Sequence, residues 1–302
     1  MFKKTTEFSL KRKPLPAKTR LAAFIELTKP RITVLILIST ALGYYLGKNN
    51  AINYLNFFYT IFGTALLSGG AGAINHYIEK DLDVLMDRTK SRPIPAGLIT
   101  SETALYFGII QSLIGVIMLW IFVNTLTAIL GLATITLYLF VYTPLKKITW
   151  LNTTVGAIPG AMPTLGGWAA SANELSPNAW VLFAILFFWQ HPHFYAIALM
   201  CREDYEKAGF KMLPVLEHEN HRTNRQIIWH AFLLIPVSLF FVVTGILGMF
   251  YFWGAFILGT VYLLSSIPLL RDSSIKNAKL LLRTSVVYLP LLLIIILVDL
   301  NY

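Results

Sequence analysis

Long apolar stretches separated by short polar loops run along almost the whole chain. The hydrocarbon core of a bilayer is about 30 Å thick, so a helix needs about 20 mostly apolar residues to cross it. Stretches of this kind lie at residues 32–48, 55–78, 102–123, 125–143, 149–170, 178–200, 226–246, 249–270 and 280–299. The pattern predicts an all-α, multi-pass membrane protein with nine transmembrane helices. Because nine is odd, the two termini are expected on opposite sides of the membrane.

Composition supports a membrane protein and excludes a soluble one. The 302 residues are 56% hydrophobic and 13% charged, whereas soluble chains are about 25% charged. The net charge of +10 would suit a nucleic-acid-binding protein, but the charges stand between apolar runs, so we expect a lipid bilayer and no nucleic acid as partner. A single cysteine, Cys201, permits no internal disulfide and is interpreted as a helix-packing residue.

The basic residues predict the orientation of the chain. With nine spans, 24 of the 25 Lys and Arg residues fall on one side and only Lys48 on the other. Cytoplasmic loops carry such an excess, so we expect a cytoplasmic N-terminus. Residues 1–20 are predicted to be a basic cytoplasmic tail and 21–302 a single transmembrane domain. No cleavable leader is recognised, and we expect a location in the cell membrane, the inner membrane if the source is Gram-negative.

One polar motif follows the second predicted span. Asn75, Glu79 and Asp83 are four residues apart, so on a continuous helix they share one face over two turns. Mg²⁺ prefers oxygen ligands and often takes only one or two carboxylates, with phosphates and waters completing its shell. Asp81 points elsewhere and is the weaker candidate. The alternative is an amphipathic helix end with internal Glu/Lys pairing.

Cationic residues follow directly, at Arg88, Lys90 and Arg92. They offer donors for phosphate oxygens. Carboxylates for a metal beside cations for phosphate predict a metal-diphosphate site.

A second motif lies in the sixth predicted span and the loop after it. His193 follows Pro192 inside the apolar stretch, where polar residues usually face a cavity or a partner. A proline there kinks the helix, and if the helix continues, Asp204 lies on the same face as His193. A histidine packed against a neighbouring helix is the alternative, favoured more for His191 than for His193.

These motifs carry a family resemblance. The spacing of Asn75, Glu79 and Asp83, with Arg88-Thr89 and Arg92-Pro93, resembles the first aspartate-rich motif of UbiA-type membrane prenyltransferases. The further motifs are Leu27-Thr28-Lys29-Pro30-Arg31, Tyr142-Thr143-Pro144-Leu145-Lys146, Gly160-x2-Pro163-x2-Gly166-Gly167-Trp168, Pro192-His193-Phe194 and Asp204-Tyr205-x2-Ala208-Gly209. Together they resemble the protoheme IX farnesyltransferases (haem O synthases) over most of residues 20–230. Two departures are Glu79, where the family usually has Asp, and Met200, four residues before Asp204.

The resemblance implies farnesyl transfer from farnesyl diphosphate to the vinyl group of haem B, giving haem O and pyrophosphate, with Mg²⁺. The residues expected to take part are Asn75, Glu79, Asp83, His193 and Asp204 as catalytic residues; Asn75, Glu79, Asp83 and Asp204 as metal ligands; Arg88, Arg92, Tyr142 and Lys146 for the diphosphate; and His193 and Trp168 on the haem side. Haem A synthase and terminal oxidase assembly proteins are further expected partners, and the active site is expected to face the cytoplasm.

The chemistry of an allylic diphosphate agrees with these residues. Ionisation needs its leaving-group charge neutralised, and the allylic cation is shielded by aromatic rings, for which Tyr77, Tyr142, Tyr195 and Tyr205 are candidates. The glycines and prolines of residues 152–168 permit close helix packing and could widen a cavity for a flat porphyrin, with plain packing as the alternative.

Two other functions stay open at this stage. A related prenyltransferase could act on an aromatic acid or a quinone precursor, sharing the first motif but not the His193 and Asp204 segments. A transporter would carry charges midway along its spans, often in paired repeats, whereas this chain keeps nearly all charge at one interface.

Overall fold

The computed structural model describes residues 19–48 and 51–300, and every regular element within them is helical. The first half contains α1 (Arg20–Leu27), α2 (Pro30–Gly47), α3 (Tyr54–Ile78), α4 (Lys80–Asp83), α5 (Ser101–Phe122), α6 (Thr125–Thr136), the π-helix η1 (Leu137–Tyr142) and α7 (Thr143–Ile148). The second half contains α8 (Asn152–Ala172), α9 (Pro177–Met200), α10 (Arg202–Lys207), α11 (Leu213–Leu216), α12 (His221–Val243), α13 (Met249–Ser266), the 3₁₀ helix η2 (Ile267–Leu270) and α14 (Ile275–Asp299). The all-α prediction is confirmed.

Within the described residues, eight helical segments are long and apolar enough to cross a membrane. They coincide with eight of the nine predicted spans, the fourth being built from α6, η1 and α7 in succession. The remaining predicted span is α8, a 21-residue helix rich in Gly, Ala, Thr and Pro that lies among the others. Its small residues are mostly buried by protein, so α8 needs less apolar surface toward lipid, and its crossing stays a prediction.

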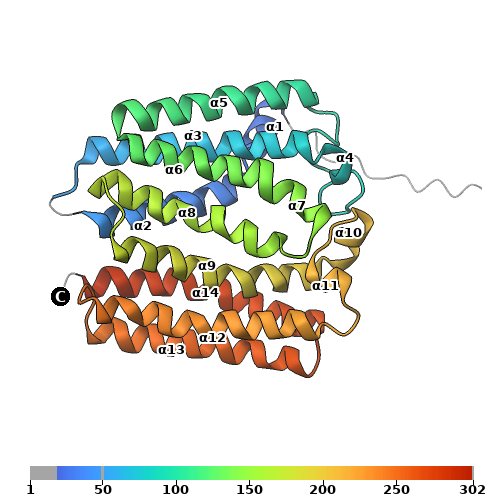
Figure 1. The fold of residues 1–302 in the computed structure, drawn as a ribbon. Helices are drawn as coiled ribbons and strands as arrows, with labels where there is room; N and C mark the ends of the chain where they lie inside the picture. Colours follow the sequence, from blue (N-terminus) through green and yellow to red (C-terminus); the bar gives the residue numbers. More distant parts are fainter. Residues whose placement is uncertain (1–18, 49–50, 301–302) are drawn as a thin grey trace, which may run out of the picture.

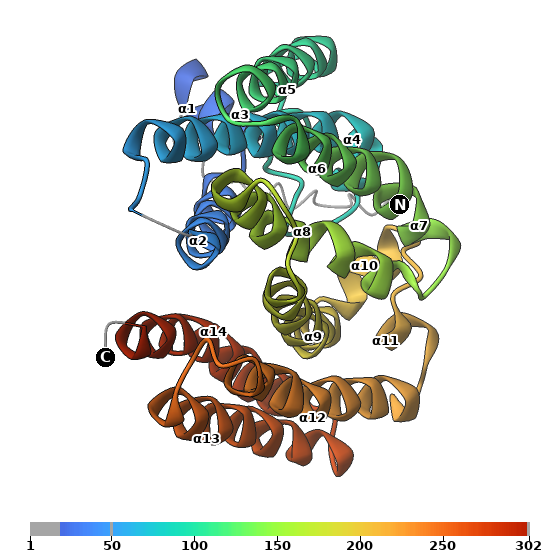
Figure 2. The same ribbon diagram turned by 60° about the vertical axis from the view of Figure 1, so that its left-hand side comes forward.

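The long helices run side by side as a bundle (Figure 1). α9 packs against α8 on one side and against α12 and α14 on the other, so it joins the two halves of the chain (Figure 2). The short helices α4, α7, α10 and α11 gather at one end (Figure 1). Three of the segments predicted to be basic, residues 79–101, 146–147 and 201–225, therefore share one end. The side of the membrane that this end faces stays a prediction.

Glycines allow the helices α2 and α8 to touch through their backbones at two points. A Cβ at Gly167 in α8 would lie 1.9 Å from the carbonyl oxygen of Thr40 in α2, and one at Gly43 would lie 2.1 Å from that of Thr164. Real Cβ atoms do not approach so closely, so α2 and α8 require glycine here. Small residues serve membrane helices in this way because no solvent drives them together.

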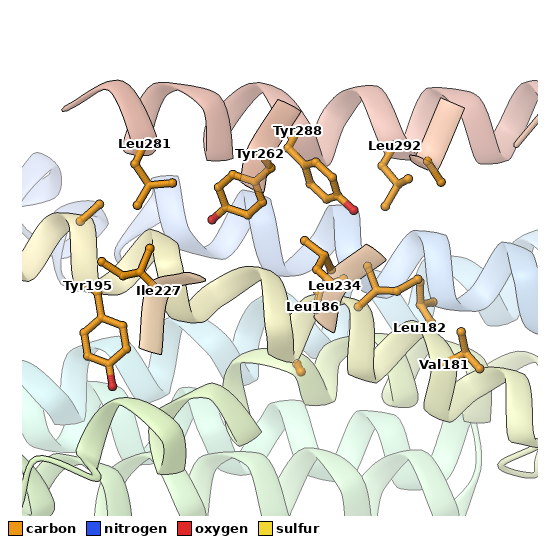
Figure 3. Packing of buried hydrophobic residues seen from close by; sticks show 14 of the residues in the cluster. Val181, Leu182, Leu186, Tyr195, Ile227, Leu234, Tyr262, Leu281, Tyr288 and Leu292 are labelled. Atoms are coloured by element: carbon orange, nitrogen blue, oxygen red, sulfur yellow. The ribbon is translucent and has the colours of Figure 1, made fainter. Parts of the chain in front are cut away.

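A large core fills the space between α9, α12, α13 and α14. Three of its buried tyrosines, Tyr251, Tyr262 and Tyr288, keep their hydroxyls paired, as buried phenols generally do. The Tyr262 hydroxyl donates to the Trp189 carbonyl at 3.1 Å, and that of Tyr251 donates to the Ser238 carbonyl at 2.9 Å. Figure 3 shows Tyr262 beside Tyr288, whose ring centroid is 5.4 Å away. This core fixes α9, which also borders the site described next.

Candidate active site

A cavity of about 530 Å³ lies inside the bundle. Parts of α2, α3, α6, η1, α8 and α9 line it, together with residues of the loops at the end that carries α4, α7 and α10. Two prolines inside α8, Pro159 and Pro163, and the glycines Gly156, Gly160 and Gly166 form part of the wall. The prediction that this segment borders a cavity is confirmed for these residues.

One end of the cavity is strongly cationic. The charged residues of the described wall are Lys29, Arg88, Arg92, Lys146 and Glu79, which gives a formal net charge of +3 when Lys29 is protonated. Cations in a low-dielectric cleft concentrate anionic ligands. This end therefore suits a polyanion such as a diphosphate, and the rest of the wall is mainly apolar.

The helix carrying the first motif breaks at Glu79. α3 ends at Ile78, and Glu79 is the capping residue between α3 and α4. The expected continuous face over Asn75, Glu79 and Asp83 is therefore wrong in its geometry. All three side chains are nevertheless buried, which is unusual for carboxylates unless they are paired.

Each of these oxygen-bearing side chains has a cationic partner. Lys29 Nζ donates to Asn75 Oδ1 at 2.5 Å, and Lys146 Nζ donates to Glu79 Oε1 at 2.6 Å. The same nitrogen lies 4.7 Å from the centroid of the Tyr142 ring. The oxygens of Asn75 and Glu79 are thus aimed at positive charge beside the cavity.

Asp83 is held differently. Both of its carboxylate oxygens accept from Arg92 Nη1, at 2.7 and 2.8 Å. Thr89 donates its hydroxyl to the Asp83 backbone carbonyl at 2.9 Å, closing the loop after α4. Asp83 is absent from the described wall of the cavity, whereas Arg92 is part of it. The arrangement makes Asp83 the residue that positions Arg92.

Asp204 connects the two motifs. α9 ends at Met200 and α10 begins at Arg202, so the condition that the helix continues from His193 to Asp204 is not met. Asp204 instead accepts from the backbone N–H groups of Asp87 and Arg88, at 3.1 and 3.3 Å. Both carboxylate oxygens therefore hold the loop that presents Arg88 to the cavity.

Lys29 and Tyr138, for which the sequence predicted no role, both line the cationic end. Lys29 Nζ lies 3.3 Å from the Tyr138 hydroxyl, and the Lys29 backbone adopts the left-handed conformation with φ 49°, just before Pro30. The available signal was the Lys29-Pro30 pair, since a lysine directly before a transmembrane span is placed at its boundary. Lys90, predicted for phosphate, pairs with Asp87 instead and lies outside the described wall.

Burial and neighbouring charges shift the pKa values of two groups outside the spans, Lys29 and Glu79. Burial lowers the pKa of Lys29 to about 7, while Glu79 opposes this and Arg92 and Lys146 reinforce it. Burial alone would raise the pKa of Glu79, but Lys146 and Lys29 outweigh it and hold that pKa below its ordinary value. Glu79 is therefore an ionised carboxylate available to a cation.

The two histidines of the second motif lie in different places: His193 borders the cavity and His191 is buried among the helices. His193 lines the cavity, stacks on Trp189 and contacts Ser285 of α14. His191 is fully buried, stacks on His230 at 3.8 Å between centroids and lies outside the described wall. His191 is thus the packed histidine that the alternative interpretation described.

Trp168, expected on the haem side, lies in a small core cluster with Leu165 and Ala179 and contacts α2 at Gly47. It lies outside the described cavity wall because the close α2–α8 packing places it between the helices. We leave it out of the proposed site.

Among the aromatic candidates, Tyr142 and Tyr205 line the cavity. Tyr77 and Tyr195 do not belong to the described wall, and Tyr195 is fully buried in the core.

The chain matches known prenyltransferases over most of its length. The model of the UbiA prenyltransferase family matches residues 36–287. A protoheme IX farnesyltransferase of Solibacter usitatus (strain Ellin6076) is 47% identical over 285 residues, which cover 91% of this chain and 98% of that one.

Two solved structures share the fold. A structure of digeranylgeranylglyceryl phosphate synthase aligns with a TM-score of 0.79 at 17% identity, covering 94% of this chain and 99% of that one. A UbiA homologue from Archaeoglobus fulgidus bound to DMAPP and Mg²⁺ aligns with a TM-score of 0.68 at 15% identity, covering 92% and 99%. The sequence matches extend over the helices that build the cationic cavity, and from them we conclude that the chain is a membrane prenyltransferase belonging to the UbiA prenyltransferase family.

Proposed function

We propose that this protein transfers the farnesyl group of farnesyl diphosphate to the vinyl group of haem B, giving haem O and pyrophosphate. The name of the relative with 47% identity supports the choice of substrates. The observation that carries the proposal is one cavity with a net charge of +3 at one end, a largely apolar interior, and a histidine on its wall.

The cationic end suits the departure of a diphosphate. When the bond between the allylic carbon and oxygen breaks, its electron pair leaves on the diphosphate, and preorganised cations stabilise that charge. Lys29, Arg88, Arg92 and Lys146 are placed to do so. Tyr142 and Tyr205 border the same region and offer ring faces to the allylic cation.

The donors fit Mg²⁺ bound together with a diphosphate rather than a cage made only of protein. No cluster of three or more His, Cys, Asp and Glu side chains occurs within residues 19–48 and 51–300. Asn75 and Glu79 are hard oxygen donors beside the cavity, and a Mg²⁺ site needs only one or two carboxylates. We assign them as ligands; Mg²⁺ would neutralise the leaving group. Asp83 and Asp204, predicted as further ligands, lie outside the described cavity wall, and we leave them out of the proposed ligand set.

On the acceptor side, the vinyl carbon attacks the allylic carbon, water adds to the resulting cation beside the porphyrin, and a proton is released. His193 borders the cavity away from the carboxylates and is proposed for the haem side. The cationic end is proposed to face the cytoplasm in the cell membrane, the inner membrane in a Gram-negative source. Haem A synthase or an oxidase assembly protein is the proposed recipient of the product.

The test is a product assay with purified protein in nanodiscs. Farnesyl diphosphate and haem should give haem O by mass spectrometry, dependent on Mg²⁺, whereas farnesyl diphosphate and 4-hydroxybenzoate should give no prenylated product. Transfer to 4-hydroxybenzoate but not to haem would refute the proposal in favour of a quinone-precursor enzyme.

A further inference from the structure

His193 makes a short hydrogen bond with a serine on another helix. Its Nδ1 atom lies 2.7 Å from Ser285 Oγ of α14, and Ser285 is fully buried. The same hydroxyl lies 2.6 Å from the backbone carbonyl oxygen of Leu282. Ser285 therefore connects the cavity wall on α9 with the backbone of α14.

These two contacts determine which nitrogen of His193 carries the proton. A serine hydroxyl has one hydrogen to donate, and a carbonyl oxygen can only accept. Ser285 is assigned as the donor to Leu282 on the basis of this short contact, so Ser285 Oγ accepts from His193 and Nδ1 carries the hydrogen. In a neutral imidazole this leaves Nε2 with its lone pair.

Further contacts fix the plane of the ring. His193 stacks on the indole of Trp189 at 5.0 Å between centroids and 25° between planes. The Trp189 indole N–H donates to the Ser285 carbonyl at 3.0 Å, and Tyr262 of α13 donates to the Trp189 carbonyl at 3.1 Å. Three helices, α9, α13 and α14, thus hold the ring.

The remaining nitrogen faces the site. His193 lines the cavity, as does Leu289, which lies one turn beyond Ser285 on α14. Among residues 19–48 and 51–300, no protein group pairs with His193 Nε2, and that atom is not among the buried polar atoms left without a partner. A lone pair on Nε2 is thus accessible to a ligand in the cavity.

We infer that Ser285 is a positioning residue that holds His193 in its Nδ1–H tautomer, so that Nε2 is presented as a ligand to the iron of the haem substrate. The inference rests on the proposed function, because it takes haem as the acceptor. Neutral imidazole is a common haem ligand, and a hydrogen bond to its other nitrogen both orients the ring and increases its basicity.

The test compares four purified proteins in nanodiscs: the parent, His193→Ala, Ser285→Ala and Ser285→Thr, which keeps a hydroxyl. Each is titrated with ferric haem by absorbance, with metal-free protoporphyrin IX by fluorescence, and with farnesyl diphosphate by calorimetry. His193→Ala should lose the ligand-dependent Soret band. Ser285→Ala should weaken haem binding about 10-fold, the low end for loss of such a partner, and shift that band. Ser285→Thr should restore both, and protoporphyrin and farnesyl diphosphate binding should be unchanged throughout.

Each result that would contradict the inference points to a different cause. If His193→Ala alters haem binding and Ser285→Ala does not, the positioning role is wrong while the proposed function stands. Equal losses for haem and protoporphyrin in Ser285→Ala would show a packing defect instead of a ligand effect. Lost farnesyl diphosphate binding in Ser285→Ala would reveal a misfolded variant, and Ser285→Thr then decides, since parent-like haem spectra there support the role and altered ones refute it. If the parent binds no haem, the proposed function fails with it.

Discussion

Gly166 and Gly167 are adjacent in α8 but have different surroundings: Gly166 borders the cavity and Gly167 packs against α2. Their variants should therefore fail in different ways. A Cβ added at Gly166 meets no atom within 4 Å, and Gly166 lines the cavity. A Cβ added at Gly167 would lie 1.9 Å from the Thr40 carbonyl oxygen. We therefore expect Gly166→Leu to fold normally and lose activity, and Gly167→Ala to lose stability.

The magnitudes follow from these contacts. Leucine at position 166 places four carbons in space that a prenyl chain would fill, and each excluded CH₂ forfeits about 0.8 kcal/mol of burial. The loss approaches 3 kcal/mol, on the order of a hundredfold in kcat/KM. At Gly167 the obstacle is backbone, which cannot rotate away, so overpacking should reach the upper part of its usual range, about 3 kcal/mol.

The position of Gly166 also predicts which substrate suffers. It lies 14 residues after Asn152, about 21 Å along α8 from the cationic end. Farnesyl diphosphate should be affected more than the shorter geranyl diphosphate. Turnover with both diphosphates and thermal unfolding are measured in nanodiscs for both variants. Parent-like farnesyl transfer by Gly166→Leu would refute the assignment of this space to substrate, and parent-like stability of Gly167→Ala would refute the close packing.

Three further outcomes are expected. Glu79→Gln should lower turnover at least about 100-fold and raise the Mg²⁺ concentration needed, because it removes the ionised oxygen donor; unchanged Mg²⁺ dependence in the product assay would contradict the metal role. Asp83→Asn should destabilise the protein by about 3 kcal/mol in thermal unfolding, because it removes the charge partner of the half-buried Arg92, and a parent-like midpoint would argue against that pairing. In a cysteine-free background, Ser91→Cys should react with a membrane-impermeant maleimide only after cells are opened and Asn173→Cys in intact cells; the reverse pattern would invert the topology.

Local sequence pattern was sufficient for the positions of the long helices and for a prediction of the chemical character of the site. Apolar stretches of bilayer length identify helices because hydrophobic burial in lipid depends on composition over about 20 residues, whatever their partners. Arg88 and Arg92 could be proposed for an anion because they follow carboxylates at the end of a span, and Lys146 was added by the motif resemblance. The structure shows that Arg92 and Lys146 also pair with Asp83 and Glu79. The motif resemblance extended this to a reaction.

Tertiary structure decided how these residues meet. The breaks at Glu79 and Cys201 are invisible to a period of 3.6 residues, because pairing Glu79 and Asp204 with groups distant in the sequence overrides local helix continuation. Lys29 reaches Asn75 across 46 positions, and His193 reaches Ser285 across 92. No periodicity encodes such pairs, since only the packing of α2, α3, α9 and α14 brings their atoms within hydrogen-bonding distance. For the same reason Trp168 looked like a cavity residue in its motif and proved to be a packing residue between helices.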